Sequence, residues 1–122
     1  TNAGEHIIQG EEFLQPADTL IITKSYKDVL VLASLGYQAV APQSESTNIS
    51  DEFITNAKQE SQNIYLLYDN DETGIKYSDK VSTEYSLIPI FVPLPIKDIS
   101  DYRLLHGEDL TKELIKTMLY EK

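Results

Sequence analysis

Several residue types are scarce in this sequence, and each absence excludes a class of site. The chain of 122 residues has no cysteine, which rules out disulfide bonds and thiolate-held zinc. Its only histidines, His6 and His106, are too few and too far apart in the chain to indicate a zinc cluster. No segment approaches the roughly 18 apolar residues of a membrane-spanning helix, and no signal peptide is visible. The expectation is therefore a cytoplasmic protein without a membrane partner.

Positive charge is also scarce. The chain has 10 lysines and arginines against 20 aspartates and glutamates, which gives a formal net charge of −10. Phosphate contacts dominate the affinity of proteins for nucleic acids, so this domain is not expected to grip DNA through a basic face of its own. The acidic composition is compatible with cation binding and equally with solubility, and most of the acids are expected to be solvated.

The composition and the length favour one folded domain. Hydrophobic residues make up 41% of the chain, and no low-complexity run, internal repeat or linker interrupts it. A chain of this length buries a sizeable core and is too short for two ordinary domains. The sequence nevertheless looks excised from a longer protein, so further domains in the same polypeptide are expected.

Four short apolar segments are predicted to form buried strands, and helix-like segments separate them. The strands are expected at 19–24, 37–41, 63–69 and 88–94, and their nearly continuous apolar character favours a sheet covered on both faces. The helices are expected at 26–36, 50–61, 72–86, about 98–107 and 109–121. Four residues of the last helix are expected to face inward: Leu110, Leu114, Ile115 and Met118.

This alternation predicts an α/β fold with a four-stranded, mainly parallel sheet and helices on both faces. The first strand is expected to lie between the second and the third, with the fourth beyond the third. The segment "HIIQG" (6–10) is a candidate edge strand. Ligands of such sheets bind beyond the carboxyl ends of the strands.

Charged residues follow three of the predicted strands and are expected to converge at one edge of the sheet. Clustered carboxylates are hard to keep ionised without a cation, and oxygen ligands without histidine or cysteine favour magnesium or manganese over zinc. The residues are Lys24 and Asp28 after the first strand, Asp69 and Asp71 after the third, and Asp98 and Asp101 after the fourth.

The letters "DNDETG" (69–74) fit the motifs of several families. They match the start of a calcium-binding EF-hand loop, but the twelfth position is Lys80 instead of glutamate, and the loop follows a strand-like segment. They also match the nucleophile motif of haloacid-dehalogenase-type phosphatases. That motif normally opens its fold on the first strand, whereas two strand–helix units precede it here.

A third interpretation uses the order of the motifs along the chain. An apolar strand leads into "KSYKDVLVLASLGYQAVA" (24–41), followed by "IYLLYDNDETGIK" (64–76) and "PIFVPLPIKDISDY" (89–102). In this order they resemble the Toprim domain, the catalytic module shared by bacterial-type primases, type IA and type II topoisomerases, and certain nucleases and recombination proteins. The resemblance runs from about Leu20 to Tyr102 and is greatest to primases and primase-helicases of phages and mobile elements.

The resemblance implies a Toprim domain over residues 19–105, with a lead-in segment at 1–18 and a C-terminal helix at 106–122 packed on it. It implies that Asp69, Asp71 and Asp98 bind Mg²⁺ or Mn²⁺, and that Asp28 is the acid of the first, catalytic motif. Gly74 matches the family's glycine, and Asp101 matches a neighbouring acid with different spacing. Asp71 is equally expected to cap the following helix. Asp28 is equally expected to be an acid of the first helical turn, where the helix dipole favours negative charge.

The implied activity is magnesium-dependent nucleotidyl transfer in a DNA primase-like replication protein. Its partners would be a DNA template and nucleotides, engaged through the full-length protein with helicase or zinc-binding domains. The alternatives are a catalytically silent Toprim module that docks nucleic acid or protein, and a Toprim nuclease.

One residue departs from the family pattern. The first motif centres on a glutamate that serves as general acid or base, and this chain has Lys24 there, with Ser25 in place of glycine. A lysine ammonium donates protons in hydrogen bonds and repels a metal ion. Lys24 is therefore expected to hold a substrate phosphate, or Glu45 to supply the missing carboxylate, or catalysis to be lost. Lys24 as a surface lysine and Glu45 as a solvated loop residue are the plainer alternatives.

Overall fold

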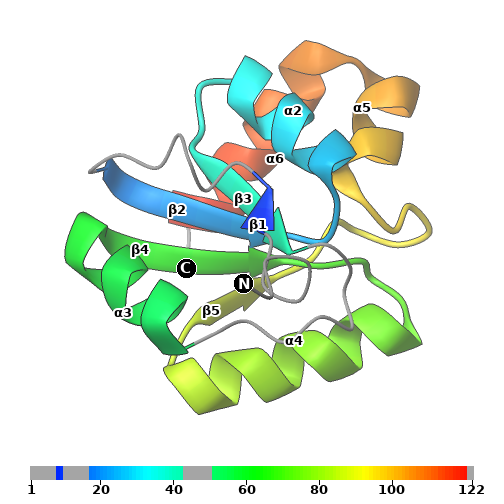
Figure 1. The fold of residues 1–122 in the computed structure, drawn as a ribbon. Helices are drawn as coiled ribbons and strands as arrows, with labels where there is room; N and C mark the ends of the chain where they lie inside the picture. The colour runs from blue at the N-terminus through cyan, green and yellow to red at the C-terminus, as the bar shows by residue number, and fades with distance from the viewer. Residues whose placement is uncertain (1–7, 10–16, 43–50, 121–122) are drawn as a thin grey trace.

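Strands and helices alternate along the chain as the sequence predicts (Figure 1). The structure is a computed structural model, and it describes residues 8–9, 17–42 and 51–120. The strands are β1 (Ile8–Gln9), β2 (Ala17–Thr23), β3 (Ala39–Pro42), β4 (Ser61–Leu67) and β5 (Ile88–Ile90). The helices are α2 (Tyr26–Ser34), α3 (Asp51–Glu60), α4 (Glu72–Tyr85), α5 (Ile99–His106) and α6 (Glu108–Tyr120).

The strand order is β1-β3-β2-β4-β5, and every pairing except that of β1 with β3 is parallel. The predicted parallel core and its order are confirmed, and the candidate edge strand in 6–10 forms as the two residues of β1. The fourth predicted strand is shorter than 88–94, because β5 ends at Ile90. Pro89 within it and Pro93 beyond it have no N–H to donate to a ladder, which suits a short edge strand.

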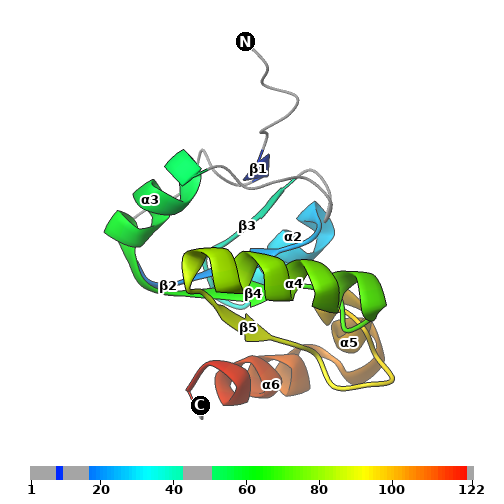
Figure 2. The same ribbon diagram turned by 90° about the horizontal axis from the view of Figure 1, so that it is seen from below.

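Each face of the sheet carries its own hydrophobic core, because successive side chains of a strand point to opposite faces. On β2, Ile21 belongs to the core that includes Leu32 of α2 and Ile115 of α6. Its neighbour Ile22 belongs to the core that includes Phe53 of α3. Figure 1 shows α2, α5 and α6 above the sheet and α3 and α4 below it, and Figure 2 looks onto α3 and α4 with the strands behind.

The inward stripe of α6 differs from the prediction at one position. In α6 the buried residues are Thr111, Ile115 and Leu119, whereas Leu110 is 54% exposed. Ile115 is buried as predicted, and Leu114 and Met118 are partly buried against the same core. Thr111 takes the inward position expected of Leu110. Its hydroxyl donates to the Gly107 carbonyl oxygen at 2.7 Å, so that its burial costs little.

Candidate active site

Lys24 and three of the predicted acids, Asp69, Asp71 and Asp98, meet at the carboxyl ends of β2, β4 and β5, which lie on the right of Figure 1. Lys24 directly follows β2, and its Nζ lies 3.5 Å from Asp69 Oδ2 and 3.8 Å from Asp98 Oδ2. The side chains of Asp69 and Asp98 are 5% and 4% exposed. Lys24 therefore stands between the acid that follows β4 and the acid that precedes α5.

A second lysine, which the sequence analysis did not single out, lies in the same crevice. Lys97 Nζ is 3.9 Å from Asp69 Oδ2 and 4.0 Å from Asp71 Oδ2. Its side chain is 54% exposed, against 21% for Lys24. The available signal was its position directly before Asp98, in a loop that the topology brings to this edge of the sheet.

Asp71 and Asp98 are held in place by the helices that they cap. Asp71 Oδ1 accepts a hydrogen bond from the Gly74 N–H at 2.8 Å at the start of α4, and Asp98 Oδ1 accepts one from the Asp101 N–H at 2.8 Å at the start of α5. In both residues the other oxygen, Oδ2, is the one that approaches a lysine. Capping and cation binding thus use different oxygens of one carboxylate, and the predicted cap at Asp71 is confirmed.

Two hydrogen bonds from Asn70 and a close contact at Gly74 fix the distance between the segments that carry these acids. Asn70, between Asp69 and Asp71, donates its backbone N–H to the Lys97 carbonyl oxygen at 2.8 Å and its side-chain amide to the Val92 carbonyl oxygen at 2.7 Å. Gly74 meets the same loop from the other side. A Cβ on Gly74 would lie 2.1 Å from the Asp69 carbonyl oxygen, so only glycine permits this approach of α4.

Asp28 lies beneath the crevice and is 1% exposed. The Ser100 hydroxyl donates to its Oδ1, and the Thr23 hydroxyl oxygen lies 3.3 Å from its Oδ2. Burial raises the pKa of Asp28, and the charge of Asp98 adds to this, while the Ser100 hydrogen bond and Lys24 oppose it. For Lys24, burial lowers the pKa, but the charges of Asp69, Asp28 and Asp98 outweigh burial and leave the pKa above its ordinary value.

Two of the predicted site residues stand apart. Asp101 is exposed, and in the cap of α5 its backbone N–H is the group that takes part. Glu45 lies outside the described residues. The Glu45 hypothesis therefore stays a prediction.

The donor set suits a hard divalent cation. Asp69 and Asp71 offer carboxylate oxygens from one short loop, which Gly74 holds against the start of α4. Within the described ranges, no group of three or more acidic, histidine or cysteine side chains is placed to hold a metal ion alone. Mg²⁺ fits this arrangement, because it commonly uses one or two carboxylates and completes its shell with water and substrate phosphates.

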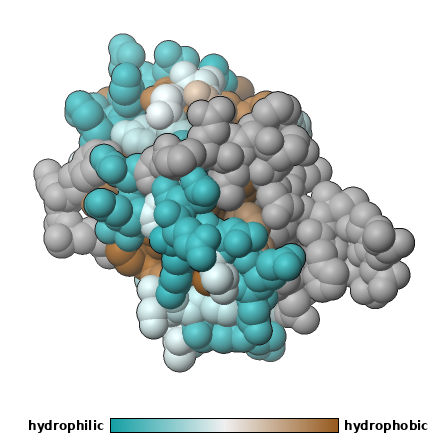
Figure 3. All heavy atoms as spheres, turned by 60° about the vertical axis from the view of Figure 1, so that its left-hand side comes forward, coloured by the Kyte–Doolittle hydropathy of each residue, from teal (hydrophilic) through white to brown (hydrophobic). Residues whose placement is uncertain are grey.

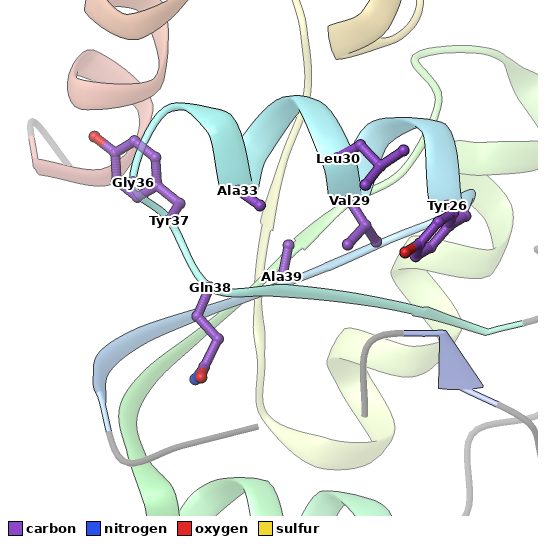
Figure 4. A pocket seen from close by; sticks show the side chains of 8 residues that line it. All are labelled: Tyr26, Val29, Leu30, Ala33, Gly36, Tyr37, Gln38 and Ala39. Atoms are coloured by element: carbon purple, nitrogen blue, oxygen red, sulfur yellow. The ribbon is translucent and has the colours of Figure 1, made fainter. Parts of the chain in front are cut away.

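Other surfaces of the described part offer no comparable chemistry. A pocket of about 450 Å³ lies beside α2 and β3, between Tyr26 and Tyr37, and its lining contains none of the crevice acids (Figure 4). On the side toward the amino ends of the strands, the described residues are mostly hydrophilic, and the hydrophobic ones lie in separate small areas (Figure 3). Among the described helices, none is long and apolar enough to cross a membrane.

Comparison with known proteins identifies the fold. A family model described as Toprim-like matches residues 21–103. The Aquifex aeolicus primase (zinc-binding and RNA polymerase domains) superposes with a TM-score of 0.70 at 21% identity, covering 93% of this chain and 30% of that one. The primase fragment of the bacteriophage T7 primase-helicase superposes with a TM-score of 0.67 at 19% identity, covering 95% of this chain and 49% of that one. The E. coli primase catalytic core superposes with a TM-score of 0.67 at 18% identity, covering 99% of this chain and 44% of that one. No curated protein matches the sequence closely enough to name as a relative.

The chain spans between 30% and 49% of the length of these solved structures, so it corresponds to one part of each. Identities of this size establish a shared fold and leave the activity open. The family model covers most of the chain, including Lys24, Asp28, Asp69, Asp71 and Asp98. The chain belongs to the Toprim-like family.

Proposed function

We propose that this chain is the Toprim domain of a primase-like replication protein and that it supports Mg²⁺- or Mn²⁺-dependent nucleotidyl transfer on a DNA template. One observation carries the proposal: Asp69, Asp71 and Asp98 each bring an Oδ2 atom to the same crevice, where a cation already lies within 4.0 Å of each. A site of this kind attracts further cations, since carboxylates outnumber lysines there.

In this proposal Asp69 and Asp71 hold the divalent ion. When bound, the ion would neutralise phosphate charge and stabilise the leaving pyrophosphate. Lys97 is the residue best placed to contact a substrate phosphate, because its ammonium is at the open side of the crevice and its side chain is 54% exposed. Asp98 fixes the start of α5 and, with Asp69, positions Lys24.

The geometry makes Lys24 a poorer phosphate ligand than its position in the motif suggests. Its side chain is 21% exposed, and its ammonium lies against two buried carboxylates. A phosphate at Lys24 would therefore approach Asp69 and Asp98 and be repelled by both. Either Glu45 or a group outside this chain would have to supply the proton-transfer role of the family glutamate.

Template binding requires surfaces beyond this domain. The net charge of −10 opposes a direct grip on the DNA backbone. One similar structure includes a zinc-binding domain and another is part of a primase-helicase, so comparable domains in the same polypeptide would supply the grip.

The second candidate is a catalytically silent docking module. It is favoured by Lys24, which replaces the family's proton-transfer residue and pairs with Asp69. The acids themselves do not separate a primase from a nuclease, because both reactions use them in the same way.

Primer synthesis by the protein that carries this domain tests the proposal. Asp69→Asn with Asp71→Asn should reduce Mg²⁺-dependent primer synthesis by at least about a hundredfold, since both metal-binding carboxylates are lost. Asn at position 71 still caps α4, so the fold should survive. Asp79→Asn, which removes an exposed acid of α4, is the matched control and should retain full activity.

Three other results would change the assignment. Metal-dependent strand cleavage without primer synthesis would indicate the nuclease. Nucleic-acid binding by the wild type without either reaction would indicate the docking module. Primer synthesis that survives the double substitution would contradict the proposed site.

A further inference from the structure

We propose that the Lys24 ammonium is a built-in cation that permanently takes one of two cation positions in the crevice. The second position, which Lys97 covers, is left for a single exchangeable divalent ion. This inference rests on the proposed function, because it concerns how the same crevice handles its metal.

The positions follow from the order in which charges alternate across the crevice. Lys24 Nζ joins Asp98 Oδ2 at 3.8 Å to Asp69 Oδ2 at 3.5 Å. Lys97 Nζ joins the same Asp69 Oδ2 at 3.9 Å to Asp71 Oδ2 at 4.0 Å. Asp69 Oδ2 is therefore shared between two ammonium groups, each of which bridges two carboxylates. An ammonium group therefore lies between Asp98 and Asp69, and another lies between Asp69 and Asp71.

The two ammonium groups differ in how easily they can leave. Lys24 is fixed at the end of β2, its side chain is 21% exposed, and both of its partners are almost fully buried. Moving it away would leave Asp69 and Asp98 facing each other in a site of low dielectric. Lys97 is 54% exposed, and its partner Asp71 is 38% exposed, so Lys97 can swing into water when a divalent ion arrives.

Lys24 therefore does what a metal ion would otherwise do for this half of the crevice. Its ammonium lies 3.5 Å from Asp69 Oδ2 and 3.8 Å from Asp98 Oδ2, and it offsets the repulsion between these two buried carboxylates. With Lys24 in place, the carboxylates of Asp69 and Asp98 stay close to each other in the absence of metal. The expected consequence is a site that binds one divalent ion between Asp69 and Asp71 and rejects a second between Asp69 and Asp98.

Counting bound Mn²⁺ tests the inference. The electron paramagnetic resonance signal of free Mn²⁺ gives the number of ions bound per chain, and the Asp69→Asn, Asp71→Asn double variant gives the background from surface acids. Above this background the wild type should bind one ion. Lys24→Met, which keeps the length of the side chain without its charge, should bind two. Lys24→Arg keeps the charge and should still bind one.

A stability measurement without metal gives an independent readout. In EDTA, Lys24→Met should melt lower than the wild type by roughly 5 °C or more, because the carboxylates lose their shared cation. Saturating Mn²⁺ should then raise the melting temperature of Lys24→Met more than that of the wild type, since two ions bind only the folded state. If Lys24→Met does not fold, the Mn²⁺ count and the melting temperatures are measured on Lys24→Gln instead.

The outcomes separate this inference from the proposed function. If the wild type and Lys24→Met each bind one ion, the inference is overturned and the Asp69–Asp71 site stands. Binding of two ions by the wild type has the same meaning. Binding no higher than the background in every variant overturns the inference and the metal site together.

Discussion

Asp28 is the most deeply buried acid of the crevice, and its environment favours the protonated carboxyl group. Its contribution to stability is therefore fully present below its unfolded pKa, near 3.8, and is lost as the pH rises through its higher folded-state pKa. A buried carboxylate kept at a cost in stability is typical of a functional site, because a position selected for stability alone would hold a neutral residue.

Asp28→Asn removes the cost of burying this charge. The variant should melt at a higher temperature than the wild type at about pH 7. The difference should shrink as the pH falls through the raised folded-state pKa of Asp28, because the wild-type carboxyl then becomes neutral as well. Thermal unfolding followed by circular dichroism across this range is the measurement. A variant that is less stable at neutral pH would show that the hydrogen bonds to the carboxylate outweigh its burial.

Lys97 should compete with the metal ion for Asp69 and Asp71. Lys97→Ala should therefore tighten Mn²⁺ binding, by roughly threefold to tenfold, the size expected for one partly exposed charge. Calorimetric titration measures the affinity. Lys80→Ala removes an exposed lysine further along α4 and should change the affinity much less. Equal effects of the two substitutions would mean that only the net charge of the chain matters.

At the scale of elements, the site depends on how closely α4 approaches the loop after β4. Gly74 is the contact point, since its position leaves no room for a Cβ against the Asp69 carbonyl oxygen. Gly36 has a different reason to be glycine: its φ is +93°, and a Cβ there would meet no atom within 4 Å. The first glycine is required by packing and the second by backbone conformation.

These two reasons predict different outcomes for alanine. Gly74→Ala must move the start of α4 and should cost about 2–3 kcal/mol, with weaker Mn²⁺ binding because Asp71 moves with the helix. Gly36→Ala should cost about 1–2 kcal/mol through the strained φ and leave Mn²⁺ binding unchanged. Chemical denaturation and a Mn²⁺ titration of both variants measure the two effects. Normal metal binding by folded Gly74→Ala would contradict the role given to this contact.

Local patterns were enough to predict these elements. The apolar segments at 19–24, 37–41 and 63–69 became strands because buried parallel strands are apolar on both faces, and the cap at Asp71 follows from its position before a helix. The inward stripe of α6 was wrong at Leu110, because a threonine that satisfies its own hydroxyl takes an inward position. Apolar periodicity gives no weight to such a residue.

At the scale of the whole molecule, parallel topology explains why residues far apart in sequence form one crevice. Lys24, Asp69 and Asp98 follow different strands, and the order β3-β2-β4-β5 places their ends side by side. The sequence therefore predicted that Lys24, Asp69, Asp71 and Asp98 come together. It did not predict their pairing: that Lys24 lies between two acids, and that Lys97 joins them, depends on side-chain positions a few ångströms apart. Spacing along a chain does not fix such positions.

The central claim is that a divalent ion binds at Asp69 and Asp71, and a Mn²⁺ titration of this chain followed by NMR tests it most directly. With few protein ligands, the affinity should be weak, in roughly the millimolar range. Paramagnetic broadening should begin at residues 69–74 and 97–101, and it should disappear when Asp69→Asn and Asp71→Asn are combined. Broadening that begins elsewhere, or that survives the double substitution, would contradict the claim.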